Sequence, residues 1–227
     1  MKVSLISIFI FLTLALNAQF KEIHYGIKGG LNLGHTIYDR ELFFSNEIEG
    51  GRWGKSLGLV MEGVLNNNIA VISGLDFVFV DDAGQDDIIT DIDNNTGEIR
   101  DLYAKYWVSS KYLQVPVLVI FKTGTPDSRI RFFGLPGFGF GFCLGSSQHF
   151  RTFDLEGNEV YSTDTKGNLY KTVRLSGILA TGLEFKLSQT LRMLTGVKID
   201  YGLNSINKSE SIKVWNHFAE FNVSVLF

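Results

Sequence analysis

The segment Leu191–Asn204, LRMLTGVKIDYGLN, alternates two kinds of residue along its length. One set of alternate positions is mainly apolar and comprises Leu191, Met193, Thr195, Val197, Ile199, Tyr201 and Leu203. The other set is rich in charge and glycine and includes Arg192, Lys198 and Asp200. Because successive side chains of a β-strand point to opposite faces, this pattern predicts a strand with one apolar and one charged face. Such a strand packs its apolar face on a soluble core or presents it to lipid in a membrane barrel.

The same alternation recurs in seven further segments. Together with the first, it predicts strands at Tyr25–His35, Ser56–Leu65, Ile69–Val80, Tyr112–Lys122, Ile130–Gly145, Thr172–Leu187, Leu191–Asn204 and Val214–Phe227. Strands of soluble proteins usually have about five or six residues. Strands that cross a membrane need about nine to eleven. The lengths therefore favour membrane-spanning strands.

The connections between these segments alternate between long and short. The expected long loops are residues 36–55, 81–110, 146–171 and about 205–213, and the short turns are Asn66–Asn68, Thr123–Arg129 and Ser188–Thr190. Short turns on one side and long loops on the other are typical of transmembrane barrels. We therefore predict an all-β fold, an eight-stranded antiparallel up-and-down transmembrane β-barrel.

The N-terminus has the features of a secretory signal peptide. Lys2 precedes the apolar run Val3–Leu16, which is too short to span a bilayer as a helix. Ala18 provides a small residue at the expected cleavage site. We predict a cleaved signal peptide at residues 1–18 and a barrel domain at residues 19–227, located in the cell outer membrane. An uncleaved anchor is the alternative.

Composition narrows the class of protein further. The 227 residues fit one domain, and 13% aromatic residues with 24 Gly and only 3 Pro favour strands over helices. The net charge is −3 and no basic run occurs, which argues against nucleic-acid binding. Cys143 is the only cysteine, so the chain forms neither an intramolecular disulfide nor a multi-cysteine metal cluster.

The charged faces of the strands point into the barrel if the apolar faces meet lipid. A lysine or arginine facing lipid at mid-depth costs about 2–4 kcal/mol, which forces this sorting. The predicted lumen charge network is Lys28, Glu62, Asp76, Arg131, Arg174, Glu184, Arg192, Lys198, Asp200 and Glu220, with Lys122 and Lys186 on the same faces. Eight strands enclose only enough room for side chains. We expect a plugged lumen, with Lys198 among Glu184, Asp200 and Glu220; a conducting pore is the alternative.

Catalytic and metal-binding patterns are not apparent in the sequence. The four histidines, His24, His35, His149 and His217, are dispersed, and no Ser-His-Asp spacing or nucleophile elbow is evident. We therefore predict a non-enzymatic protein without a cofactor or a metal.

Two loop features have alternative interpretations. Asp91–Glu98 resembles the start of an EF-hand, but its glycine is one place late and no helical pattern flanks it. We expect a solvated acidic loop, with a calcium site as the alternative. Asp154–Tyr161 and Asp164–Tyr170 each begin with an Asp-x-x-Gly-Asn turn signal. They are either hairpin tips above the membrane or irregular loop.

Three segments carry a family resemblance. Tyr25–Leu33 (YGIKGGLNL), Tyr112–Lys122 (YLQVPVLVIFK) and Gly182–Phe185 (GLEF) resemble recurring segments of the PorT-like outer-membrane β-barrel proteins of Bacteroidetes-type bacteria. Pro116 matches the proline of the family's Tyr-Leu-x-apolar-Pro segment, and a local bulge is expected there. The resemblance implies an outer-membrane barrel of the porin family without catalytic residues. One branch of the family is linked to type IX secretion.

The predicted function is a structural or binding role through long extracellular loops. The expected partners are outer-membrane lipid and the outer-membrane assembly machinery, which would recognise the terminal aromatic Phe227. The resemblance adds secretion-system proteins, in an accessory role, as an alternative. A secreted soluble ligand-binding barrel is a further alternative, and it would leave Lys28, Asp76, Lys198 and Glu220 outside.

Overall fold

The computed structural model describes residues 20–38, 52–92, 99–167, 172–206 and 214–227 of the chain. These residues form nine strands: β1 (Glu22–Tyr38), β2 (Trp53–Val64), β3 (Ile69–Ile92), β4 (Ile99–Lys122), β5 (Ile130–Phe153), β6 (Glu159–Gly167), β7 (Val173–Lys186), β8 (Arg192–Gly202) and β9 (Val214–Leu226). Within these ranges, no helix is long and apolar enough to cross a membrane.

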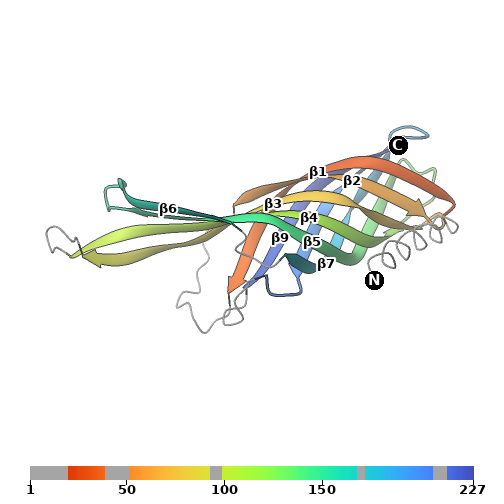
Figure 1. Cartoon of the computed structure of the whole chain (residues 1–227). Coiled ribbons are helices and arrows are strands. Elements are labelled where there is room, and N and C mark those ends of the chain that lie inside the picture. Colours follow the sequence, from red (N-terminus) through yellow and green to blue (C-terminus); the bar gives the residue numbers. More distant parts are fainter. Residues whose placement is uncertain (1–19, 39–51, 93–98, 168–171, 207–213) are drawn as a thin grey trace, which may run out of the picture.

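Eight of the strands close into a ring. The hydrogen-bonded order is β4-β3-β2-β1-β9-β8-β7-β5, and a further β4–β5 ladder joins the two ends of this series. Each pairing is antiparallel. Strand β6 pairs only with the far end of β5 and lies outside the ring (Figure 1). The eight-stranded antiparallel barrel predicted from the sequence is confirmed, and β6 is an additional ninth strand.

Two of the predicted long loops are largely strands. β3 continues to Ile92, β4 begins at Ile99 and β5 continues to Phe153 before turning into β6. These extensions form a four-stranded sheet that projects beyond one end of the ring (Figure 1). We call residues 81–92, 99–110, 146–153 and 159–167 the outer sheet. On β4 one face of this sheet is buried, at Leu102, Ala104 and Val108, so the alternation of burial continues beyond the ring. Residues 81–110 were expected to be a loop because they are rich in Asp.

The two faces of the ring differ in the sense expected for a membrane barrel. Outward-facing Leu57 and Phe132 are each 66% exposed, and Leu179 is 62% exposed, whereas the inward-facing Glu62 and Asp200 are fully buried. A soluble barrel would place these apolar side chains inside. The burial pattern therefore overturns the soluble-barrel alternative.

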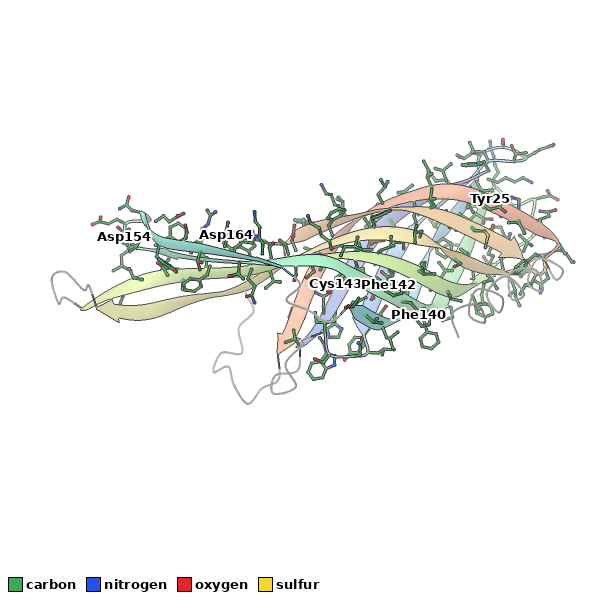
Figure 2. All side chains as sticks on the ribbon, viewed as in Figure 1. Tyr25, Phe140, Phe142, Cys143, Asp154 and Asp164 are labelled. Carbon is green, nitrogen blue, oxygen red and sulfur yellow. The ribbon has the colours of Figure 1, made fainter. Side chains whose placement is uncertain are left out.

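Aromatic residues lie at both ends of the outward apolar surface. Tyr25 lies at the end of the ring away from the outer sheet (Figure 2), and Phe227 is bonded to it there. Trp53 and Tyr201 lie toward the other end, since Trp53 is paired with Leu33 and Tyr201 with His217. Tyr25 and Phe227 are joined by two backbone hydrogen bonds, of 3.2 and 2.8 Å, which fasten the first strand to the last. Aromatic residues in two belts around an apolar band are typical of transmembrane barrels.

Candidate functional site

A first group of buried charges lies at the short-turn end of the barrel. The ammonium group of Lys122 forms ion pairs with both Glu62 and Glu184. Arg192 lies 2.7 Å from Glu62 and 3.5 Å from Glu184, and Arg131 lies 3.5 Å from Glu184. We call these five residues the turn-side cluster. Three cations share two carboxylates, so each carboxylate is neutralised from more than one strand.

Arg131 connects this cluster to the short turns. Its Nε donates to the carbonyl of Thr123 at 2.9 Å, and its guanidinium also donates to the carbonyl of Asn67. Asn67 and Thr123 belong to two of the turns predicted from the sequence. The cluster therefore closes this end of the barrel by fastening it to the connections between strands.

A second group of buried charges lies nearer the outer sheet. Lys28 Nζ is 2.7 Å from Asp76 Oδ2, and Lys198 Nζ is 3.0 Å from Glu220 Oε1. Both carboxylates are almost completely buried. Each pair joins different strands, β1 to β3 and β8 to β9, so the pairs also hold the ring together.

Arg174 and Asp200 complete the second group. Their atoms Nη2 and Oδ1 are 2.6 Å apart, and the second carboxylate oxygen accepts a 2.7 Å hydrogen bond from Gln114 Nε2. The guanidinium carbon of Arg174 lies 5.2 Å from the ring centroid of Phe218, which adds a cation–π contact. We call Lys28, Asp76, Gln114, Arg174, Lys198, Asp200 and Glu220 the loop-side cluster.

An apolar layer separates the two clusters. Along β4 the inward side chains run from Gln114 through Leu118 and Ile120 to Lys122. Buried residues of the other strands join the same layer, including Ile72, Phe133, Leu135, Ile178 and Leu194. The interior is therefore charged, then apolar, then charged again. This apolar middle layer was not predicted from the sequence, where only the charged residues indicate the inward faces.

All ten residues predicted for the lumen lie inside the ring, but not in one network. Glu62, Arg131, Glu184 and Arg192 belong to the turn-side cluster and the other six to the loop-side cluster. The expected contact between Lys198 and Glu184 is wrong. Lys198 is paired in register with Ala180, and Glu184 lies four residues further along β7, opposite Leu194. Lys186 instead pairs with Asp127 at the exposed turn, at 3.0 Å.

Inward-facing glycines make room for the buried carboxylates. Gly58 is paired in register with Asp76, and a Cβ atom at Gly58 would lie only 2.5 Å from Asp76 Oδ1. At Gly30, which is paired in register with Asn222, an added Cβ would lie 2.9 Å from Glu220 Cγ. A barrel of only eight strands accommodates long acidic side chains because the neighbouring positions lack side chains.

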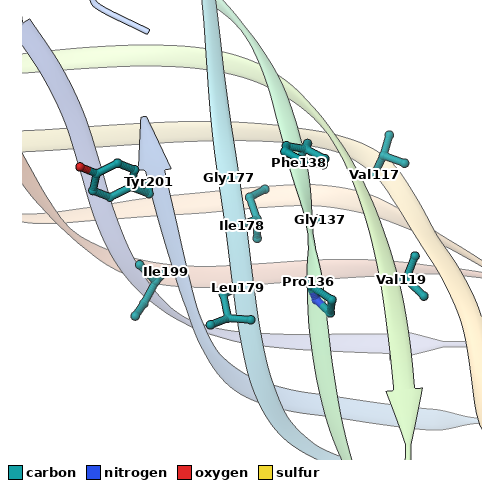
Figure 3. Close-up of a pocket in the computed structure, with 10 residues that line it drawn as sticks. All are labelled: Val117, Val119, Pro136, Gly137, Phe138, Gly177, Ile178, Leu179, Ile199 and Tyr201. Carbon is teal, nitrogen blue, oxygen red and sulfur yellow. The ribbon is translucent and has the colours of Figure 1, made fainter. Parts of the chain in front are cut away.

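A shallow depression lies on the outside of the ring. Its volume is about 630 Å³, and its walls are apolar side chains of β4, β5, β7 and β8, among them Val117, Pro136, Phe138 and Leu179 (Figure 3). Gly177 lines the depression without filling it, and an added Cβ there would meet only Leu203 Cδ2, at 3.9 Å. This outer surface suits acyl chains.

The outer sheet carries a cluster of aromatic and basic side chains. The rings of Trp107 and His149 are stacked, with centroids 5.0 Å apart and planes inclined by 15°. The guanidinium carbons of Arg52 and Arg151 lie 4.4 and 5.3 Å from the Trp107 ring centroid. These residues come from two strands, β4 and β5, and the segment before β2, so the cluster depends on the sheet for its assembly.

His149 is also the centre of a hydrogen-bonded chain. Its Nε2 lies 3.1 Å from Ser147 Oγ, and its Nδ1 lies 2.7 Å from Asp164 Oδ1. Asp164 lies on the outer sheet, well beyond the ring (Figure 2). No Ser-His-Asp spacing is apparent in the sequence, because Ser147, His149 and Asp164 all lie in a segment expected to be a loop. The available signal was Ser147-x-His149, a spacing that puts both side chains on one face of a strand.

The tip between β5 and β6 is a tight turn, as one interpretation of its sequence predicted. Asp154 accepts hydrogen bonds from the backbone N–H groups of Glu156 and Asn158, at 3.0 and 2.7 Å, and from the Asn158 side chain at 2.9 Å. Gly157 adopts φ +89°, which suits glycine. The hydrogen bonds from Asn158 lower the pKa of Asp154 below its usual value. The second turn signal behaves differently, because Asp164 lies within β6.

The calcium alternative concerns Asp91–Glu98, of which residues 93–98 lie outside the described residues. Within the described part of the chain, no group of three or more His, Cys, Asp or Glu side chains is placed to hold a metal ion.

A closed antiparallel ring with an apolar outside and a charged inside defines a transmembrane β-barrel. A family model described as an outer membrane protein beta-barrel domain matches residues 17–208, and the chain belongs to this family. Among curated proteins, none matches the chain.

Several solved outer-membrane proteins are similar to the chain. Ail, the attachment invasion locus protein of Yersinia pestis, is 14% identical over 91% of this chain and 99% of its own, with a TM-score of 0.41. Neisserial surface protein A is 11% identical over 91% and 100%, with a TM-score of 0.44. OprG from Pseudomonas aeruginosa is 12% identical over 92% and 97%, with a TM-score of 0.42.

Proposed function

We propose that the chain is a closed outer-membrane barrel that anchors the outer sheet at the cell surface, where the sheet has a structural or binding role. The observation that carries the proposal is the filled interior, with the turn-side cluster, the apolar layer and the loop-side cluster in series. In this role the barrel itself is non-enzymatic and conducts no solute.

The energetics of the interior support a closed barrel. An ion crossing it would have to part the ion pairs that Lys122 makes with Glu62 and Glu184, then pass a layer of apolar side chains. Breaking a buried ion pair by removing one partner typically costs about 3–5 kcal/mol. An ion would also lose its hydration in the apolar layer, so steady conduction is strongly disfavoured.

Targeting and assembly follow from the two ends of the chain. We propose that residues 1–18 are a cleaved signal peptide that directs export across the inner membrane. We further propose that Phe227, which is 60% exposed at the end of β9, is read by the outer-membrane assembly machinery. The secretion-accessory role implied by the PorT-like resemblance stays a prediction, tested by deleting the gene and measuring delivery of proteins to the cell surface.

Single-channel recording in planar bilayers tests the closed interior. The wild-type protein should show no steady current above that of the lipid, after a heat-modifiability gel has shown that the barrel is folded. A Glu62→Ala/Lys122→Ala/Glu184→Ala variant removes three of the five turn-side side chains but leaves the apolar layer and the loop-side cluster in place, so it should stay closed as well. A steady ohmic current through the folded wild-type barrel would overturn the proposal.

A further inference from the structure

The hydrogen-bonded chain on the outer sheet has the order of atoms that nucleophilic catalysis requires. With its proton on Nδ1, His149 donates to Asp164 and leaves Nε2 free to accept from the Ser147 hydroxyl. This is the tautomer in which a histidine acts as a general base toward serine while a carboxylate holds the ring. Distances of 3.1 and 2.7 Å are within hydrogen-bond reach for both steps.

The sheet holds the three side chains in place. Ser147 and His149 are two residues apart on β5, and His149 is the direct register partner of Asp164 on β6. The stacked ring of Trp107 on β4 fixes the plane of the imidazole from the other side. The His149 side chain is 18% exposed and that of Asp164 is 46% exposed, so the group is ordered yet open to a substrate. Sites on strands are held more accurately than sites on loops.

We propose that Ser147, His149 and Asp164 form an ester-hydrolysing site on the outward face of the outer sheet. Ser147 Oγ attacks the carbonyl carbon of a carboxylic ester as its proton passes to His149 Nε2. The tetrahedral intermediate collapses, the ester C–O bond breaks, and the departing alkoxide takes the proton from Nε2. Water then attacks the acyl-serine, again giving a proton to His149, which returns it to Ser147 Oγ as the carboxylic acid leaves. Asp164 is a positioning residue throughout.

A positive residue lies beside the nucleophile on the same face. Lys166 is the register partner of Ser147 on β6. Lys111 on β4 is directed away, with its ammonium group 6.0 Å from the ring centroid of Phe79 on β3. Cations near the reacting carbonyl stabilise the negative charge that develops on its oxygen. They also favour a substrate that carries an anionic group.

The location of the site indicates a lipid substrate. On β4 the exposed apolar residues Val117 and Val119 share their face with Lys111 and Trp107, so the outward face of the outer sheet continues the outward apolar surface of the ring. Ser147 lies just beyond the point where that apolar surface ends. Given the membrane orientation of the proposed function, on which this step rests, the substrate class is an ester of an anionic lipid in the outer leaflet.

The nucleophile is tested with a fluorophosphonate probe on the purified, folded full-length barrel. The probe should form a covalent adduct on Ser147, located by peptide mass spectrometry, with loss of fluoride. Ser147→Ala should abolish the adduct. Ser109→Ala is the matched control, since Ser109 is the register partner of Ser147 on β4, and this variant should label like the wild type. A folded wild-type protein that leaves Ser147 unlabelled would overturn the proposal.

The roles of His149 and Asp164 are tested by labelling rate. Asp164→Asn keeps the size of the side chain and should slow labelling on the order of 10²–10⁴-fold, as should His149→Gln. Asp164→Glu should restore part of the rate, which a purely structural role would not predict. Labelling of Asp164→Asn and His149→Gln at the wild-type rate would show an ordinary surface serine and overturn the site.

The substrate class is tested by fatty-acid release. Wild-type protein in mixed micelles should hydrolyse phosphatidylglycerol faster than phosphatidylcholine, and Lys166→Gln should reduce that preference. Release from phosphatidylcholine at an equal or higher rate would overturn the anionic-lipid assignment. The heat-modifiability gel on the same samples reports the barrel separately, so failure of the proposed function is distinguishable from failure of the hydrolytic site.

Discussion

Lys198 Nζ lies 3.0 Å from Glu220 Oε1 inside the barrel, and the two side chains are only 8% and 3% exposed. The pair joins β8 to β9 at directly opposed register positions. The neighbouring residue Val197 points the other way and is 51% exposed. Two adjacent residues of one strand therefore occupy opposite environments, and substitutions at the two positions should have different costs.

Lys198→Met should destabilise the barrel by about 3–5 kcal/mol, because it leaves the Glu220 carboxylate buried without its partner. Val197→Ala should be much milder, since it removes atoms from the outer surface. Reversible unfolding in urea from lipid vesicles measures both. The double variant Lys198→Met/Glu220→Gln should recover part of the loss. A neutral Lys198→Met beside a costly Val197→Ala would contradict the assignment of the two faces.

Gly58→Ala should destabilise the barrel by about 1–3 kcal/mol through overpacking. The added Cβ would lie 2.5 Å from Asp76 Oδ1 and 2.6 Å from the Leu75 carbonyl oxygen, and the backbone atom cannot move aside easily. Gly134→Ala on β5 is the matched control, because no atom lies within 4 Å of an added Cβ there. Equal stability of the two variants in urea would show that the loop-side cluster does not depend on this space.

The ring could be predicted from sequence because its two environments impose a period of two. Leu191–Asn204 alternates apolar with charged or glycine residues along its length. In the structure Val197 faces outward and Lys198 faces inward, as predicted. The outer sheet is less evident in the sequence. On β4 its buried face carries Leu102, Ala104 and Val108, but this short alternation lies in an Asp-rich segment that favours a loop.

For the candidate sites too, one part could be predicted from the sequence and another could not. Whether a lumen residue points inward follows from its place in the alternation along its own strand. Which residue it pairs with follows from the stagger between strands. That stagger pairs Glu184 with Lys122 of β4, far away in sequence, instead of Lys198 on the adjacent strand. The contact between His149 and Asp164 likewise requires the β5–β6 register. Alternation within one strand contains no information on either.

The tip of the outer sheet should loosen at acid pH. Hydrogen bonds from Asn158 lower the pKa of Asp154, so the turn is stabilised at pH values above the ordinary aspartate pKa. This stabilisation is lost as the pH falls through the lowered pKa of the folded turn. Limited proteolysis at the tip should accelerate over that acid range, measured with an acid-active protease. Asp154→Asn should be cleaved readily at every pH. A cleavage rate that is independent of Asp154 and of pH would contradict the role of the carboxylate.

The last prediction places a charge on the outer surface of the ring. Leu179 on β7 is 62% exposed, among Val117, Pro136 and Phe138 in the apolar depression of Figure 3. Leu179→Arg should cost about 2–4 kcal/mol in lipid vesicles if the position is near mid-depth, because the guanidinium must face hydrocarbon.

Leu155→Arg is the matched control. Leu155 is 73% exposed at the tip of the outer sheet, where water solvates the charge, and the change there should be nearly neutral. Urea unfolding from vesicles gives both values, and the difference should shrink when the same variants are unfolded from zwitterionic detergent micelles, whose head groups reach the charge more easily. Equal costs at positions 179 and 155 in vesicles would mean that the outer surface of β7 does not face lipid.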